Sequence, residues 1–174
     1  MMGEPRGYLF VCTGNTCRSP MAEALWKARV GTGGIPAWSA GVSAWSGQPA
    51  QALAVEAVAA LGGDLSIHLS RDLSEVTENP WRVLTMTAAQ TDAVKALRPE
   101  WASRTSLLTE FVGDCGDIPD PIGQGREAYA AAAARLKELL ARLPEQADRA
   151  PESVGGKTPA SAGQDSPSES GEAE

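Results

Sequence analysis

Apolar residues along this chain gather in short runs that alternate with longer segments of helical periodicity. The runs are mostly apolar and lack a period-two alternation, a pattern typical of strands buried on both faces of a sheet. This alternation of strands and helices predicts an α/β domain, a four-stranded parallel sheet with helices on both faces. The four runs cover residues 8–11, 38–42, 81–86 and 105–108.

The segments that separate these runs predict helices. Ser19 and Pro20 are typical of a helix start, with serine as the cap and proline at the first helical position. Val94 and Leu97 are expected to face inward from a later helix. That later helix is expected to begin at Thr87. Two further helices are expected over residues 49–61 and 125–143.

The end of the chain differs from the rest in composition. From Gln146 it is rich in Ser, Gly, Pro, Ala and Glu, so it cannot bury enough apolar surface to offset its ordering entropy. We expect a folded domain over residues 1–145 and a disordered acidic tail over residues 146–174. Residues from Glu145 onward carry a net charge of −5, against −7 for the whole chain. Neither part has a basic stripe, so nucleic acid is not an expected partner.

The cysteine and histidine content narrows the chemistry. Three cysteines and an N-terminus unlike a signal peptide argue against a secreted disulfide scaffold and predict reduced thiols in the cytoplasm. No apolar run approaches the roughly 18 residues of a membrane span, so no membrane association is expected. A structural zinc site usually needs four clustered Cys or His ligands. His68 is the only histidine, so a metal site is not expected.

The loop between the first strand and the first helix carries the candidate chemistry. Cys12 ends the strand and Arg18 stands six residues later, at the helix start. A loop that curls back at a helix N-terminus points its N–H groups into one concave site, which binds an oxyanion. The helix dipole and Arg18 favour the thiolate of Cys12, a nucleophile aimed at phosphorus. The candidate phosphate-binding residues are Thr13, Gly14, Asn15, Thr16, Cys17 and Ser19.

Four of these loop residues have expected roles of their own. Gly14 permits a close approach of the backbone to the ligand. Asn15 can hold the loop by side-chain hydrogen bonds and tolerates left-handed backbone geometry. Ser19 can donate a hydrogen bond to the Cys12 thiolate. Cys17 has two interpretations, a packed thiol or a reversible disulfide partner that protects Cys12 from over-oxidation.

A second loop supplies the acid that cleavage of a phosphoester requires, because the leaving atom must be protonated as it departs. The loops 12–19 and 113–125 follow the first and fourth strands, so they should lie at the same sheet edge, where such folds bind ligands. Asp120 is the preferred acid because Pro121 fixes the backbone beside it, and Asp117 is the alternative.

The run 11–23 resembles the active-site signature of the low-molecular-weight protein tyrosine phosphatases. The Ser-Ala-Gly sequence at 39–41 and the Asp-Pro pair at 120–121 agree with that family in order, and the resemblance covers residues 7–144. It implies a phosphorylated protein as substrate and no metal or organic cofactor.

The resemblance also implies a role for each central residue. Cys12 is the nucleophile that forms a phosphocysteine, Arg18 binds the phosphate, and Asp120 acts as acid and then as base. Thr16 resembles the bacterial protein-arginine-phosphatase branch, whereas phosphotyrosine enzymes tend to have a bulkier aliphatic residue there. Ile122 follows the Asp-Pro pair, where both branches often have an aromatic residue. Thr16 makes phosphoarginine the expected substrate, with phosphotyrosine as the alternative, whereas Ile122 departs from both branches.

Two other classes of function fit the same loop less well. A thiol-linked arsenate reductase needs additional cysteines to relay a disulfide, and only Cys115 lies outside the loop. A phosphate-binding module without catalysis should lack the nucleophile or the acid, and this chain has Cys12 and Asp120. Trp45, in the loop after the second strand, can supply a stacking face for a phenol ring. The oligomeric state stays open.

Overall fold

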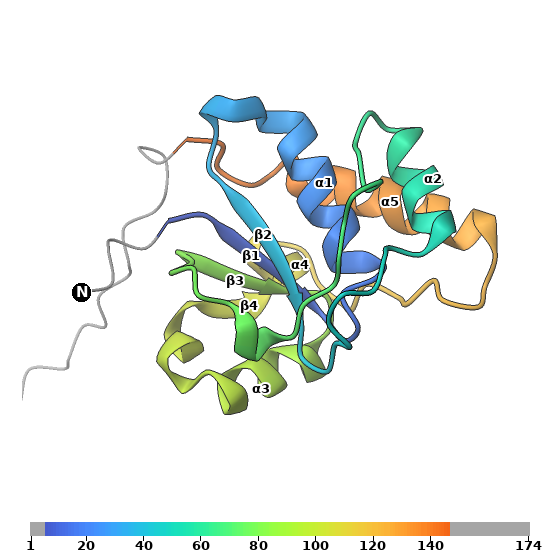
Figure 1. Ribbon diagram of the computed structural model, residues 1–174. Coiled ribbons are helices and arrows are strands. Elements are labelled where there is room, and N and C mark those ends of the chain that lie inside the picture. Colours follow the sequence, from blue (N-terminus) through green and yellow to red (C-terminus); the bar gives the residue numbers. More distant parts are fainter. Residues whose placement is uncertain (1–5, 147–174) are drawn as a thin grey trace, which may run out of the picture.

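Four parallel strands form the central sheet in the computed structural model, which describes residues 6–146 (Figure 1). Their order across the sheet is β2-β1-β3-β4, so the predicted α/β fold with a four-stranded parallel sheet is confirmed. The tail expected over residues 146–174 lies, from residue 147 onward, outside the described residues. The strands are β1 (Tyr8–Cys12), β2 (Ala37–Gly41), β3 (Arg82–Thr85) and β4 (Thr105–Leu107).

Helices cover both faces of this sheet. α1, α2 and α5 pack against one another on one face, and α3 lies on the other (Figure 1). Among residues 6–146, no helix combines the length and apolar character that crossing a membrane requires. The α-helices are α1 (Arg18–Val30), α2 (Ala52–Ala59), α3 (Ala88–Leu97), α4 (Leu108–Phe111) and α5 (Arg126–Leu140). Short 3-10 helices cover Gly31–Gly33, Leu73–Glu75 and Pro99–Arg104.

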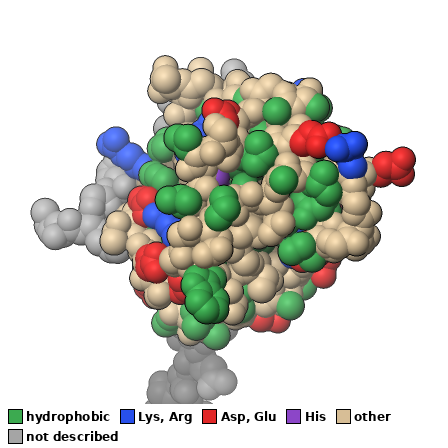
Figure 2. Space-filling view, turned by 45° about the vertical axis from the view of Figure 1, so that its right-hand side comes forward, with side chains coloured by type: hydrophobic (Ala, Val, Ile, Leu, Met, Phe, Trp, Pro, Cys, Tyr) green, Lys and Arg blue, Asp and Glu red, His purple; other side chains and the backbone are tan. Residues whose placement is uncertain are grey.

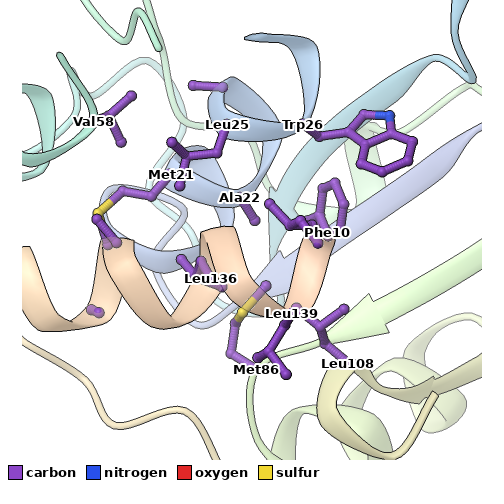
Figure 3. Packing of buried hydrophobic residues seen from close by; sticks show 14 of the residues in the cluster. Phe10, Met21, Ala22, Leu25, Trp26, Val58, Met86, Leu108, Leu136 and Leu139 are labelled. Atoms are coloured by element: carbon purple, nitrogen blue, oxygen red, sulfur yellow. The ribbon is translucent and has the colours of Figure 1, made fainter. Parts of the chain in front are cut away.

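Alternate residues of β1 enter two separate hydrophobic cores. Phe10 packs in the core that also contains Met21 of α1 and Leu136 of α5 (Figure 3). Leu9 faces the opposite side, in the core that contains Val94 of α3. Every residue of β1 is buried, because both faces of a central parallel strand are covered. This packing holds the C-terminal end of β1, where the candidate chemistry lies, in a fixed position.

Two predicted helix starts differ from the structure. α1 begins at Arg18, so Ser19 lies inside its first turn and is not the cap. The hydroxyl of Ser19 instead reaches the sulfur of Cys12. The second helix is shorter than the predicted 49–61, because Gln51 is not helical and its N–H donates to the carbonyl oxygen of Thr16. Both helix starts differ from the prediction at a contact with the candidate phosphate-binding loop, residues 12–19.

The prediction that Leu97 faces inward is wrong. Leu97 is the last residue of α3 and its side chain is 57% exposed, whereas Val94 is buried as predicted. Pro99 begins a 3-10 helix after α3, and the large ring of Trp101 from that helix is buried in the same core as Val94. The 3-10 helix thus supplies the apolar volume that the sequence pattern assigned to Leu97.

Candidate active site

The loop between β1 and α1 is anchored to the edge of β2. The N–H groups of Val42 and Ser43 donate hydrogen bonds of 3.0 Å to the carbonyl oxygens of Cys12 and Thr13, respectively. A Cβ atom added to Gly41 would lie 2.4 Å from the Thr13 carbonyl oxygen. Only glycine allows so close an approach, so the Gly at the end of β2 is what lets the loop sit against this strand.

The sulfur of Cys12 is held by donors from its own loop. Its Sγ lies 2.9 Å from the Ser19 hydroxyl oxygen and accepts a 3.3 Å hydrogen bond from the backbone N–H of Asn15. The Asn15 side-chain amide donates to that same hydroxyl oxygen at 2.9 Å, which leaves the hydroxyl hydrogen for Cys12 or for the Ala40 carbonyl at 3.3 Å. Donors of this kind stabilise a thiolate. The expected contact of Ser19 with the sulfur is therefore present.

Asn15 is the residue that fixes the shape of the loop. Its φ of 55° lies in the left-handed region, which asparagine tolerates, and the residue is fully buried. Its amide nitrogen also donates to the Ser39 hydroxyl at 3.0 Å, and its side-chain oxygen accepts from the backbone N–H of Arg71 at 2.9 Å. The ring nitrogen Nε2 of His68 lies 2.8 Å from the Asn15 carbonyl oxygen. Two separate segments, β2 and residues 68–71, thus hold one residue.

Replacing Asn15 with alanine should destabilise the protein by about 2–4 kcal/mol. Part of this cost arises because alanine bears the full left-handed backbone cost of about 1–2 kcal/mol, which asparagine partly offsets through its side-chain hydrogen bonds, and the rest is the loss of buried hydrogen bonds. Asn15→Gly loses the same hydrogen bonds but adopts the backbone freely, so it should be about 1 kcal/mol more stable than Asn15→Ala. Urea unfolding of the two variants measures the difference. Equal stabilities would contradict the role given to the backbone geometry.

Arg18 and Asp120 bring the two predicted loops together. The Nη2 atom of Arg18 lies 3.3 Å from the Asp120 carboxylate, and Nη1 donates to the Ile118 carbonyl oxygen at 2.9 Å. The Nε atom of Arg18 is buried and has no hydrogen-bond partner among the described residues. Asp117, the alternative acid, instead accepts the N–H of Ala88 at the start of α3. Of the two aspartates, Asp120 is therefore the one that faces Arg18.

Gln90 is a site residue that the sequence analysis missed. It completes a capping box with Thr87 at the start of α3, and its side-chain oxygen accepts the N–H groups of Met86 and Thr87. Its amide nitrogen donates to the Thr13 hydroxyl at 3.1 Å. The spacing of Thr87 and Gln90 signals the cap, but no sequence pattern signals the contact with the loop, because it joins residues far apart in the chain.

Cys17 is packed behind the loop. Its sulfur lies 3.5 Å from the Tyr129 hydroxyl and 3.9 Å from the Thr16 hydroxyl, and it is buried. Burial raises the pKa of the Cys17 thiol, so at neutral pH this cysteine stays protonated and does not compete as a nucleophile. The contact with α5 favours the packed-thiol interpretation of Cys17. Cys115 is exposed.

The residues around the loop differ in exposure. Thr13 is exposed, and Gly14 and Thr16 are half-buried, so these three border the solvent side of the loop. Trp45 in the loop after β2 is 82% exposed, and Ile122 after the Asp-Pro pair is 51% exposed. Both side chains are available to contact a substrate next to the loop.

Comparisons with known proteins agree with this geometry. A family model described as low molecular weight phosphotyrosine protein phosphatase matches residues 8–152. A protein-arginine-phosphatase of Geobacillus stearothermophilus is 39% identical over 143 residues, which are 82% of this chain and 96% of that protein. The low molecular weight protein-tyrosine-phosphatase Etp of Escherichia coli K12 is 35% identical over 122 residues, 70% of this chain and 80% of that protein.

Solved structures give the same result. The crystal structure of a low molecular weight protein tyrosine phosphatase from T. tengcongensis matches with a TM-score of 0.74 and 39% identity, covering 79% of this chain and 96% of that one. YwlE arginine phosphatase from Geobacillus stearothermophilus matches with a TM-score of 0.73 and 39% identity, covering 79% and 90%. The fold and the matches define a phosphatase enzyme. The chain belongs to the low molecular weight phosphotyrosine protein phosphatase family, as the sequence predicted.

Proposed function

We propose that this enzyme hydrolyses phosphoarginine in proteins through a phosphocysteine on Cys12. In the first step the thiolate attacks phosphorus, the S–P bond forms and the P–N bond breaks, while Asp120 gives its proton to the departing nitrogen. In the second step the Asp120 carboxylate takes a proton from a water molecule whose oxygen attacks phosphorus. The P–S bond breaks, which releases inorganic phosphate and restores the thiolate.

The observation that carries this proposal is the buried guanidinium of Arg18, in the same loop as Cys12, which keeps a donor without a partner among the described residues. The Nη1 atom of Arg18 donates a hydrogen bond to the Ile118 carbonyl oxygen, while its buried Nε has no partner among residues 6–146. Nε and Nη2 form one edge of the guanidinium, which matches two oxygens of a phosphoryl group. A phosphoryl group bound there competes with Asp120 for Nη2 and frees the carboxyl to act on the leaving atom.

Groups of this chain can fill each proposed role. The covalent step uses Cys12, the positive charge comes from Arg18 and the α1 N-terminus, and proton transfer uses Asp120. The active-site cysteine has a counterpart in a solved YwlE arginine phosphatase, 37% identical over 78% of this chain, in which serine replaces cysteine and the active-site serine is phosphorylated. The phosphorylated serine supports a covalent intermediate for that relative and, by extension, for Cys12.

The choice of phosphoarginine rests on Thr16 and on the relatives. Thr16 offers a hydroxyl at the edge of the loop, where it can position a polar, planar phosphoguanidinium. Two relatives named protein-arginine-phosphatase, from Geobacillus stearothermophilus and Bacillus subtilis, are 39% and 38% identical to the chain. Ile122 offers no ring to sandwich a phenol. Phosphotyrosine remains the second candidate because Trp45 is an exposed aromatic side chain near the loop.

Replacing Thr16 with isoleucine tests the substrate assignment. The variant loses one hydroxyl hydrogen bond to the phosphoguanidinium, so kcat/KM on phosphoarginine peptides should fall about tenfold, while that on phosphotyrosine peptides should rise. Thr16→Ser keeps the hydroxyl and is the matched control. Unchanged phosphoarginine turnover, with no gain on phosphotyrosine, would remove Thr16 as the basis for the assignment.

Arsenate-dependent oxidation of thioredoxin by the purified protein would instead favour the arsenate reductase alternative.

A further inference from the structure

Exposed large hydrophobic side chains are concentrated around the candidate active site. Figure 2 brings forward the side toward which the strands of Figure 1 point, and hydrophobic side chains are spread over it. Leu97, at the end of α3, is the exception to this concentration. Among residues 6–146, the other four stand on loops that either contain Asp120 or form hydrogen bonds to the loop of residues 12–19. These four are Trp45, Ile67, Leu69 and Ile122, between 51% and 91% exposed.

Ile67 and Leu69 form a strip that is tied to the phosphate loop. They flank His68, whose ring contacts the Asn15 carbonyl oxygen at 2.8 Å. Leu69 also forms a β-bridge with Pro49, two residues before the N–H group that donates to the Thr16 carbonyl. Two independent connections thus place this strip beside the loop, yet the side chains are 91% and 63% exposed. Exposed apolar groups held in this way typically mark a binding surface.

The strip borders a cavity of about 470 Å³ whose wall combines apolar and charged residues. Trp38 and Leu65 contribute apolar walls beside the strip. The charged wall residues are mostly paired with one another, Glu23 with Lys27 and Arg71 with Glu78. The wall also includes Asp64 and His68, so the part that favours a nonpolar side chain is the one formed by Trp38, Leu65 and the strip.

We propose that the Ile67–Leu69 strip and its cavity bind a nonpolar side chain of the substrate polypeptide, a few residues from the phosphorylated residue. This inference rests on the proposed function and extends it to the sequence around the phosphorylated site. An extended polypeptide spans roughly 3.3 Å per residue, so about three residues cover roughly 10 Å. Over that length, a substrate polypeptide can place its phosphorylated side chain in the loop of residues 12–19 while a neighbouring residue lies across the segment that contains His68.

The test compares two phosphoarginine peptides that differ only in having leucine or serine at the three positions on each side of the phosphorylated residue. The wild-type enzyme should favour the leucine peptide about tenfold in kcat/KM, mainly through KM. The double variant Ile67→Ser/Leu69→Ser should treat both peptides alike and hydrolyse para-nitrophenyl phosphate at the wild-type rate. Leu97→Ser, which removes an exposed leucine from the other face of the sheet, should keep the preference.

Binding to the Cys12→Ser variant separates this inference from the proposed function. Fluorescence anisotropy of the labelled peptides should give the same preference for leucine in the absence of turnover. Equal binding of the two peptides, or a preference that survives Ile67→Ser/Leu69→Ser, would overturn the docking proposal. A dimer that becomes a monomer in the double variant, seen by light scattering, would assign the strip to a second copy and also overturn it. A binding preference retained in Cys12→Ser, together with no turnover of phosphoarginine peptides by the wild-type enzyme, would overturn the proposed function instead.

Discussion

Replacing Cys12 with serine is expected to lower kcat on phosphorylated substrates at least about 10³-fold, the largest loss for any single substitution in this protein. A serine hydroxyl at this position is a far weaker nucleophile than the thiolate, because the loop stabilises an anion on sulfur and does not supply a base for a hydroxyl. Folding should be nearly unaffected, because an oxygen accepts the hydrogen bonds that Asn15 and Ser19 direct at the sulfur.

Initial rates with a phosphoarginine protein and with para-nitrophenyl phosphate measure this loss. Cys115→Ser is the matched control, because Cys115 is exposed and stands outside the loop, and it should retain the wild-type rate. Phosphate binding to Cys12→Ser should persist, since Arg18 and the loop amides remain. Turnover within about tenfold of wild type in the Cys12→Ser variant would eliminate the covalent route through this residue.

Replacing Asp120 with asparagine should have the second largest effect, a loss of about 10²–10⁴ in kcat on phosphoarginine. The asparagine cannot protonate the departing nitrogen, while its amide oxygen can still lie near Arg18. The loss in kcat/KM, which reports formation of the phosphocysteine and not its later hydrolysis, should be much smaller for an aryl phosphate with a good leaving group such as para-nitrophenol, because that group departs without a proton. This dependence on the leaving group distinguishes a general acid from a residue that only positions Arg18.

Asp117→Asn is the control for that substitution. Asp117 is three residues away and accepts the N–H of Ala88, a bond that an asparagine oxygen can also accept. Its activity should stay within about threefold of wild type, with no change in leaving-group dependence. If Asp117→Asn shows the leaving-group dependence and Asp120→Asn does not, the two aspartates have been assigned the wrong way round.

Much of the fold was predictable because the signals are local. The apolar run of β1 and the helical stripe of α5 each specify an element, and the alternation of elements specifies a parallel sheet. The meeting of Arg18 with Asp120 was predictable in outline, since loops after parallel strands share one sheet edge. For Ser19 the predicted contact with Cys12 is present, but its assignment as the helix cap is wrong, because α1 begins one residue earlier.

The supporting contacts were beyond the reach of sequence reasoning. Asn15 was expected to hold the loop, but its partners Ser39, His68 and Arg71 come from segments that no spacing rule connects to it. The bond from Gln90 to the loop has the same character. Such contacts depend on how crossing segments are packed over the sheet, and a single sequence records no period or motif for them.

The most direct test of the covalent mechanism is mass spectrometry of the enzyme quenched in acid during turnover of a phosphoarginine protein. Asp120→Asn with para-nitrophenyl phosphate should accumulate more of the intermediate, because that leaving group departs without the acid while loss of the base that activates water slows the second step. We expect one added phosphoryl group on the proteolytic fragment that contains Cys12, and none after Cys12→Ser. Continued release of inorganic phosphate with no phosphoryl group on Cys12, or with one on Cys17 instead, would contradict the mechanism.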